Sequence, residues 1–286
     1  MNQRVASQLT SVHNVVMLAA LLGIGLTGSI AVSPKTSDTL AQRIRTGPVS
    51  SAPQPTQSAE AAVAAVTPRK KEVLAFNAKL HAYYDQISQK MKWLPVRYAG
   101  NLLQTPDPES RLMLVQSAAE KARLQEVGLS YADVYGIINA ETTWIPRMGA
   151  SKDGTPNVGI AQFEPATAAA VGLTDPTDPV QAVHAAAAHM KDAAVWSAKH
   201  IAGLNLQPEQ HAQKLREGVS IYYNLSSKGR NKWNGLNTAK LPVETQRHIA
   251  NARLGAREAA ELESQLASLK SRMKGEGVMT ASFRTN

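Results

Sequence analysis

The sequence predicts a mainly helical fold. Only 5% of its 286 residues are aromatic, and alanine is abundant, a composition that favours helices over a β-sandwich. Apolar residues recur at steps of three and four in several segments, which is the spacing of one face of an α-helix. Prolines and glycines bound these segments where helices begin and end, and no run alternates convincingly as a strand. We therefore expect a helical protein with six helices.

The N-terminus predicts export. Residues 15–32 form an uncharged apolar run, close in length to the roughly 20 residues of a helix that spans a bilayer. Arg4 precedes this run, and Ser29 and Ala31 have the spacing that a signal peptidase accepts. The run is long for a signal peptide, whereas its internal glycines argue against a permanent anchor. We expect residues 1–32 to be a signal peptide or a membrane anchor, so that the remainder is periplasmic or faces the periplasm from the inner membrane.

Two segments separate this run from the main domain. Residues 33–69 are rich in Ser, Pro, Thr, Gln and Ala and hold few large apolar side chains, so we expect a flexible tether. Residues 70–114 predict an accessory helical segment, because apolar residues recur there at helical spacing, and Pro95 is expected to end its helix. Those apolar residues are Val73, Phe76, Leu80, Tyr83 and Ile87.

The main domain is expected to follow this accessory segment. A helix opens at Ser130, with Asp133 placed as its reciprocal cap, and Pro146 is expected to stop it. Residues 149–163 are rich in glycine and turn formers, which predicts a loop or a small hairpin. The later helices are expected to begin at Pro165, Pro179, Pro208 and Pro242.

The C-terminal part, residues 254–286, is expected to be a helix followed by a tail. The helix is expected to end at Gly275. Its apolar residues in heptad spacing are Leu262, Leu266, Leu269 and Met273. This seam is too short to demand a coiled coil.

Charge and composition restrict the function only in part. The formal net charge of +9 suits an anionic partner such as nucleic acid, a membrane surface or the cell wall, but no basic and aromatic array supports nucleic-acid binding. The absence of cysteine excludes disulfides, thiolate metal sites and a cysteine nucleophile. His184 and His189 fall on different faces of one predicted helix and are expected to face solvent. We expect neither a metal nor a cofactor.

Glu141 is the candidate catalytic residue. It shares a helix face with apolar residues such as Val134 and Ile138, and a carboxylate there is costly unless it is paired or protonated. The negative end of the helix dipole also disfavours the ionised form. A carboxylic acid that stays neutral can donate a proton to a leaving oxygen. The alternative is a structural glutamate paired with Arg147 or with a distant lysine.

Five short motifs follow in order from Glu141 onward. They are Glu141-Thr142 followed by Pro146, GIAQFEPATA at 159–168, DPTDP at 175–179, YYN at 222–224 and LPVET at 241–245. Together they resemble the signature of the soluble lytic transglycosylase, or goose-lysozyme-like, domain family over roughly residues 115–253. The chain departs from that pattern with Thr142 in place of serine, Ala161 in place of methionine and Tyr222 in place of alanine.

The resemblance implies a lysozyme-like helical fold with a long sugar groove, and it assigns roles to single residues. Glu141 would be the sole acid and base, Gln162 would bond the sugar or the acid, and Tyr223 would support Glu141. Trp144 could stack on a sugar face or lie in the core. The other substrate-binding residues are expected to be Thr142, Ser151 and Asn224.

We therefore expect a peptidoglycan lytic transglycosylase, which cleaves the β-1,4 bond between N-acetylmuramic acid and N-acetylglucosamine and leaves 1,6-anhydro-muramyl ends. One alternative is a goose-type lysozyme, a hydrolase in which Asp153 would hold a water, although Asp153-Gly154 is also an ordinary turn. Another is a non-catalytic peptidoglycan-binding assembly protein. The expected partners are glycan strands and, if residues 15–32 are uncleaved, the inner membrane. Wall turnover, a secretion or conjugation apparatus, and a phage particle are all open as contexts.

Overall fold

A computed structural model of the protein describes residues 57–151 and 153–282. The apolar run at 15–32 and most of the predicted tether therefore lie outside the described residues. None of the described helices combines the length and the apolar character that a bilayer span requires. The described residues belong to one compact unit.

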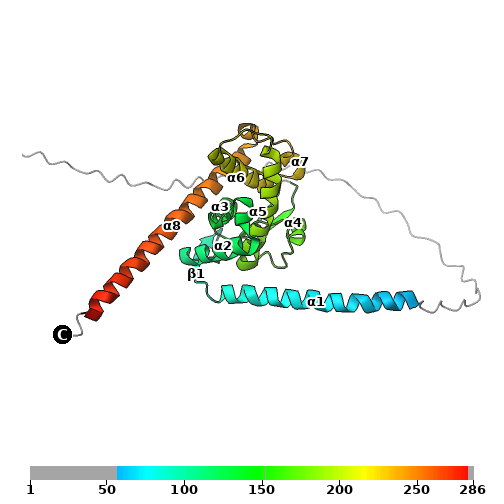
Figure 1. Ribbon diagram of the computed structural model, residues 1–286, viewed down its shortest axis with the longest axis horizontal. Coiled ribbons are helices and arrows are strands. Elements are labelled where there is room, and N and C mark those ends of the chain that lie inside the picture. Colours follow the sequence, from blue (N-terminus) through cyan, green and yellow to red (C-terminus); the bar gives the residue numbers. More distant parts are fainter. Residues whose placement is uncertain (1–56, 152, 283–286) are drawn as a thin grey trace, which may run out of the picture. The chain divides into compact units, whose positions relative to one another are not determined.

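The described residues are mainly helical, as the sequence predicts (Figure 1). The helices are α1 (Gln57–Ser88), α2 (Pro108–Ala122), α3 (Tyr131–Thr142), α4 (Pro165–Ala170), α5 (Pro179–Ile201), α6 (Pro208–Asn224), α7 (Ser227–Arg230) and α8 (Val243–Ser282), with two short 3-10 turns, η1 (Leu124–Val127) and η2 (Thr238–Lys240). The strands are β1 (Trp93–Tyr98), β2 (Asn101–Pro106), β3 (Arg147–Ala150) and β4 (Pro156–Gly159). They pair as two antiparallel hairpins, β1 with β2 and β3 with β4. The second hairpin begins at Arg147, two residues before the segment 149–163 for which a loop or a small hairpin was expected.

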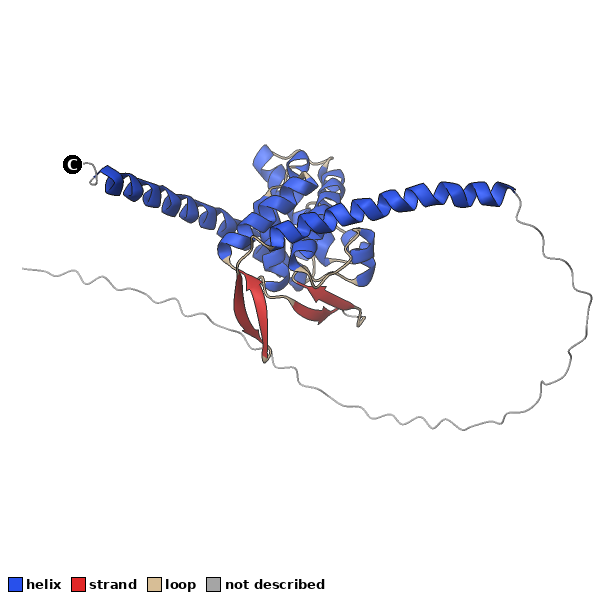
Figure 2. Ribbon diagram, turned by 90° about the horizontal axis from the view of Figure 1, so that it is seen from below, coloured by secondary structure: helices blue, strands red, loops and turns tan. Residues whose placement is uncertain are grey.

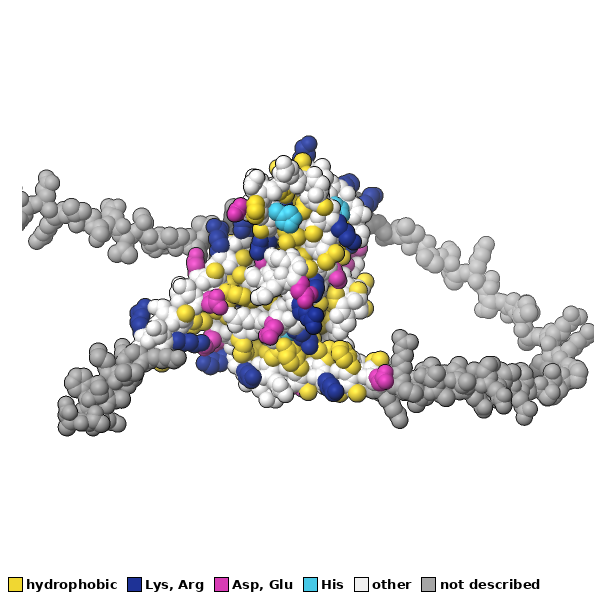
Figure 3. All heavy atoms as spheres, in the orientation of Figure 1, with side chains coloured by type: hydrophobic (Ala, Val, Ile, Leu, Met, Phe, Trp, Pro, Cys, Tyr) yellow, Lys and Arg dark blue, Asp and Glu magenta, His cyan; other side chains and the backbone are white. Residues whose placement is uncertain are grey.

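Helix α1 differs from the prediction at both ends. It begins at Gln57, so residues 57–69, assigned to the tether, are helical. It ends at Ser88, well before Pro95, because a strand begins at Trp93. Hydrophobic side chains are visible along α1 in Figure 3, and Val73 and Phe76 are 51% and 66% exposed.

The β1–β2 hairpin was not expected. Its turn is formed by Ala99 and Gly100, whose φ angles of 49° and 81° are those of a tight two-residue hairpin turn. Pro95 lies within β1, which is possible because proline is tolerated on an edge strand, where no partner needs its missing N–H. The sequence did not predict this hairpin, because β1 contains a proline and the turn is neither Asn-Gly nor Asp-Gly.

Two of the predicted domain boundaries cut helices. The boundary between residues 114 and 115 falls inside α2, whose first turn is capped by Asp107 through a 2.7 Å hydrogen bond from the Ser110 N–H. The boundary between 253 and 254 falls inside α8, which also continues beyond Gly275, its expected end. Helices α2 and α8 therefore continue across these two boundaries.

Helix α5 runs through the middle of the helical body (Figure 1). Its buried positions are mostly small residues, including Ala182, Ala186 and Ala193, which allows α2 and α6 to pack closely on it. His184, expected at the surface, is only 4% exposed, so that prediction is wrong. The side chain is surrounded by Tyr83 and Tyr84 of α1.

Two glycines allow α3 and α8 to cross in close contact. A Cβ atom on Gly136 of α3 would lie 2.2 Å from the carbonyl oxygen of Ala252 in α8. A Cβ atom on Gly255 of α8 would lie 2.6 Å from the Cβ of Asn139 in α3. Because real Cβ atoms do not approach backbone this closely, only glycine permits this crossing. The crossing brings the first turns of α8 beside the end of α3.

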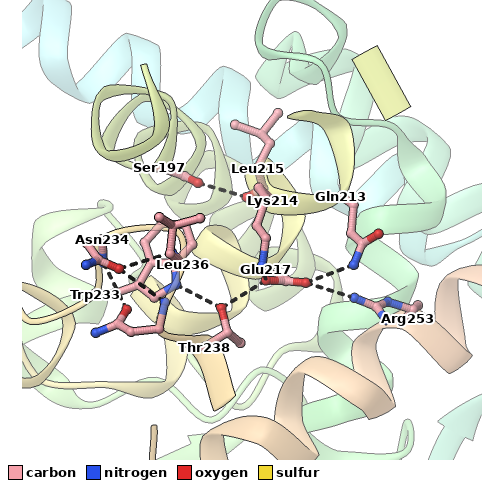
Figure 4. Close-up of polar contacts among 11 residues, drawn as sticks. Ser197, Gln213, Lys214, Leu215, Glu217, Trp233, Asn234, Leu236, Thr238 and Arg253 are labelled. Atoms are coloured by element: carbon pink, nitrogen blue, oxygen red, sulfur yellow. Dashed lines mark hydrogen bonds and ion pairs between the residues drawn. The ribbon is translucent and has the colours of Figure 1, made fainter. Parts of the chain in front are cut away.

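The buried carboxylate of Glu217 in α6 bonds to side chains of α8 and η2. Glu217 is 5% exposed and forms ion pairs with Lys214 at 2.7 Å and Arg253 at 3.3 Å. It also accepts hydrogen bonds from Thr238 and Gln213 at 3.0 and 3.1 Å, and these side chains converge on it in Figure 4. Burial alone would raise the pKa of Glu217, but the hydrogen bonds, chiefly from Lys214, outweigh burial and lower the pKa. The group is therefore ionised and structural.

Candidate active site

Helix α3 carries Glu141 at its C-terminal end. Its start is fixed as predicted, because Asp133 accepts a 2.8 Å hydrogen bond from the backbone N–H of Ser130. Its end comes earlier than the predicted stop at Pro146, since Thr143 and Trp144 adopt left-handed φ angles of 53° and 65°. Trp144 has no exposed surface. It therefore lies in the core, which was one of its two expected roles.

The carboxylate of Glu141 meets an imidazole from α8. Nε2 of His248 lies 2.8 Å from Oε1 of Glu141, and the two side chains are 5% and 15% exposed. Nδ1 of His248 is buried and has no hydrogen-bond partner among the described residues. The pair depends on the close crossing of α3 and α8, because His248 lies one turn before Ala252, which contacts Gly136.

The alternative partner proposed for Glu141, Arg147, does not contact its carboxylate. Instead, Nη2 of Arg147 donates a 2.6 Å hydrogen bond to the main-chain oxygen of Glu141. This bond satisfies one of the carbonyl groups left unpaired at the end of α3. Arg147 therefore links the end of α3 to β3, and the carboxylate of Glu141 bonds to His248 instead.

Tyr223 of α6 completes the immediate surroundings of Glu141. Its ring stacks on His248, with centroids 6.4 Å apart and planes inclined by 18°. Its hydroxyl donates a 3.0 Å hydrogen bond to the main-chain oxygen of Ala161. Burial, followed by the negative charge of Glu141, raises the pKa of Tyr223 well above its ordinary value. Tyr223 therefore stays neutral and keeps its proton as a hydrogen-bond donor.

Gln162 and Thr142 hold the segment that follows β4. Nε2 of Gln162 donates to the main-chain oxygens of Arg147 and Gly159, both at 2.8 Å. Thr142, only 1% exposed, donates to the main-chain oxygen of Ile160 at 2.8 Å. The expected substrate-binding role of Thr142 therefore does not fit its burial. Both residues position the loop beside the end of α3.

Three other residues that the sequence proposed for the site form hydrogen bonds within the protein. Ser151 donates to the side chains of Asn157 and Glu164 within the β3–β4 region. The amide oxygen of Asn224 accepts a 2.8 Å hydrogen bond from Thr245. Asp153 is exposed and accepts a 3.0 Å bond from the N–H of Thr155, which is an ordinary turn. Hydrogen bonds from Thr155 lower the pKa of Asp153.

A row of aromatic rings extends from Tyr223 along α5 and α6. His189 lies 5.3 Å from Tyr223 and 5.2 Å from Tyr222, measured between ring centroids, and Trp196 lies 5.5 Å beyond Tyr222. His189 is thus half-buried among rings, and its expected solvent exposure is wrong. Burial lowers the pKa of His189, so it is neutral at pH 7.

His248 is a site residue that the sequence did not predict. The residue lies three positions after Thr245, the last residue of the LPVET motif, and therefore on the same face of α8. Thr245 is fully buried and bonded to Asn224, which directly follows Tyr223. The helical spacing from Thr245 was thus a signal in the sequence that could have predicted His248 as a site residue.

Other features of the described residues lie apart from this site. A cavity of about 620 Å³ between α3, α6 and α8 is lined by residues such as Ile137, Glu217 and Arg253, and neither Glu141, His248 nor Tyr223 lines it. No group of three or more His, Asp or Glu side chains in the described residues could hold a metal ion.

Comparisons with known proteins do not identify the chain. No protein-family model matches it, and no curated protein matches it at a significant level. The family resemblance is therefore a prediction that depends on the five motifs between residues 141 and 245.

Proposed function

We propose that this protein is a peptidoglycan lytic transglycosylase in which Glu141 is both the acid and the base. The observation that carries the proposal is a carboxyl group, 15% exposed, held at a helix end by His248 at 2.8 Å and flanked by Tyr223. Such an arrangement gives one titratable group a fixed direction while leaving part of it accessible. The order of the five motifs supports the choice of substrate.

The reaction would begin with proton transfer from Glu141 to the glycosidic oxygen that leaves with N-acetylglucosamine. The positive charge that develops on the muramyl ring would be stabilised by its own N-acetyl group. The 6-hydroxyl of the same ring would then attack the anomeric carbon, and the Glu141 carboxylate would take up its proton. No water is consumed, and the proton returns to Glu141.

His248 and Tyr223 would assist this cycle in different ways. After the first proton transfer Glu141 is an anion, and an N–H at Nε2 of His248 would stabilise it through a charge-assisted hydrogen bond. Tyr223 keeps its hydroxyl on Ala161 at 3.0 Å and provides a flat wall beside the pair. We assign both residues to positioning and Glu141 alone to catalysis.

Transglycosylation is favoured over hydrolysis by the surroundings of the nearby carboxylates. A hydrolase commonly needs a second group to hold the attacking water. Asp153 is exposed and bonded to Thr155, and Glu164 is bonded to Ser151. An internal hydroxyl needs no such group, because it is already tethered to the reacting sugar.

We further propose a lysozyme-like fold for the helical domain and a periplasmic location. The mainly helical architecture and the placement of Glu141 at the end of α3 support the first proposal. The apolar run at 15–32 supports the second. Whether residues 15–32 are cleaved, and whether a secretion or conjugation apparatus is a partner, are separate questions for experiment.

The test is mass analysis of the fragments that the purified protein releases from peptidoglycan. We expect muropeptides with 1,6-anhydro-muramyl ends, each one water lighter than the hydrolysed product. Reducing muramic acid as the main product would instead support the lysozyme alternative. Binding to peptidoglycan without release of fragments would support the non-catalytic alternative.

A further inference from the structure

The β1–β2 hairpin lies against the segment that follows Glu141. Oγ1 of Thr105 in β2 donates a 2.5 Å hydrogen bond to the main-chain oxygen of Trp144. At the other end of the hairpin, the guanidinium of Arg147 lies 5.7 Å from the ring centroid of Tyr98. Figure 2 shows the two hairpins at the same edge of the helical body. The hairpin is thus attached to the candidate site at two points.

One face of this hairpin is mostly apolar and partly exposed. Alternate residues of a strand share a face, so Leu94, Val96 and Tyr98 lie together. The register adds Leu103 opposite Val96, with the polar residues Thr105 and Asn101 opposite Leu94 and Tyr98. Leu94 and Tyr98 are 44% and 39% exposed. Leu102, which pairs with Arg97, belongs to the opposite face and is 66% exposed.

The charge on and beside this hairpin is positive. Residues 93–106 contain Arg97 and no acidic residue. Arg147 uses Nη2 for the main-chain oxygen of Glu141, and its other guanidinium nitrogens have no hydrogen-bond acceptor among the residues that the structure describes. A guanidinium with N–H groups to spare beside an aromatic ring suits a ligand with a carboxylate and an apolar portion.

Peptidoglycan offers that combination at one position. Its muramyl residues carry short peptides, which combine small apolar side chains with carboxylates, whereas the sugars of such strands are uncharged because each lactyl carboxyl group is amidated by its peptide. We propose that Tyr98 and Arg147 form a subsite for the peptide attached to a muramyl residue, with the Leu94–Tyr98 face of the hairpin as its apolar wall. This inference rests on the proposed function and adds a preference for glycan strands that still carry their peptides.

The test compares two substrates that differ only in the peptide. Intact peptidoglycan is one. The other is the same material stripped of its peptides by an amidase, with the lactyl carboxyl group that the amidase frees then capped as its methylamide. We expect the wild-type protein to cleave the peptide-bearing strands faster, and Tyr98→Ser to bring the ratio of the two rates about fivefold closer to one, as expected for the loss of about 1 kcal/mol. The matched control is Leu102→Ser, on the opposite face of the same hairpin, which should keep the wild-type ratio.

Equal rates on the two substrates, or an unchanged ratio in Tyr98→Ser, would overturn the subsite. A thermal unfolding curve checks that each variant is folded, and Arg147→Gln in a sedimentation assay with both substrates gives a second measurement. If the wild-type protein cleaves neither substrate, the proposed function fails, while sedimentation still reports on the subsite. In that case, the subsite is supported if the wild-type protein binds peptide-bearing strands preferentially and Tyr98→Ser abolishes this preference. Equal binding of the two substrates by the wild-type protein would refute the subsite.

Discussion

Nε2 of His248 lies 2.8 Å from Oε1 of Glu141, although the two residues are 107 positions apart in the chain. Neither side chain has much contact with water, at 5% and 15% exposure. A hydrogen bond between two titratable groups is stronger in such surroundings than at a surface. The contact therefore fixes the direction of the Glu141 carboxyl group and sets where its proton can be held.

The first prediction concerns Glu141 itself. Glu141→Gln preserves the shape and a polar contact with His248 but removes the titrating acid. We expect a folded protein whose rate on peptidoglycan is at least about 100-fold lower, the usual contribution of a general acid. Near-normal release of fragments by a folded Glu141→Gln variant would refute the site.

The second prediction concerns His248. His248→Ala removes the hydrogen bond to Glu141 and opens space beside it, and we expect a roughly tenfold or greater loss in kcat with a smaller change in KM. His248→Gln keeps a donor near Glu141 and should recover part of that loss. Equal activity of the two variants would show that a hydrogen-bond donor at this position does not contribute to the rate. Steady-state kinetics on one substrate batch measures this.

The third prediction tests how the crossing of α3 and α8 builds the site. Gly136→Ala would place a methyl group 2.2 Å from the main-chain oxygen of Ala252, so α8 must shift. We expect a loss of about 1–3 kcal/mol in the free energy of unfolding, together with reduced activity, because His248 moves with α8. Gly203→Ala is the matched control, since nothing lies within 4 Å of its added Cβ and its φ is not positive. A Gly136→Ala variant as stable and active as the control would argue against this account.

Local signals in the sequence were sufficient for the starts of α3, α5 and α6. Asp178 accepts a 2.8 Å hydrogen bond from the N–H of Val180, and Pro179 and Pro208 occupy the first positions of α5 and α6, as predicted. Such caps depend on residues within one turn, which the sequence displays directly. The β1–β2 hairpin was missed, because Pro95 and an Ala-Gly turn are weak signals for strands. Helix α2 was missed although Asp107 and Pro108 provide the same kind of local start signal.

Only the site residues that belong to one of the five motifs were predictable from the sequence. Glu141 and Tyr223 lie close together, and the charge of Glu141 contributes to the raised pKa of Tyr223. The orientation of Gln162 was not predictable, because it depends on two main-chain oxygens of the β3–β4 hairpin. His248 was missed because its partner comes from another helix, and the crossing that joins them depends on Gly136 and Gly255.

The last prediction concerns His184, the buried histidine between α1 and α5. Nδ1 must donate to the main-chain oxygen of Val180 at 2.8 Å, because a carbonyl can only accept. In the neutral ring Nε2 is then an acceptor, 3.2 Å from the hydroxyl of Ser117, which also lies 2.6 Å from the hydroxyl of Tyr83. Protonation of Nε2 would require the Ser117 hydroxyl to accept instead of donate, and it would place a charge in the core. Burial is the main reason that the pKa of His184 falls from 6.5 to about 4, with the charge of Lys121 acting in the same direction and Val180 and Asp178 opposing it.

The sign of the effect on stability follows from that lowered pKa. The unfolded chain binds a proton at His184 more readily than the folded one, so the contribution of this group to stability is complete above pH 6.5 and is lost as the pH falls toward 4. The full loss is on the order of 3 kcal/mol. Urea unfolding of wild type and His184→Gln at several pH values measures it, since Gln does not titrate and other groups contribute equally to both proteins. We expect the wild-type free energy of unfolding to fall more steeply than that of His184→Gln between pH 6.5 and 4. Parallel curves would mean that His184 takes up its proton as easily in the folded protein as in the unfolded chain, and the packing of α1 on α5 through Tyr83 would then not depend on a neutral ring.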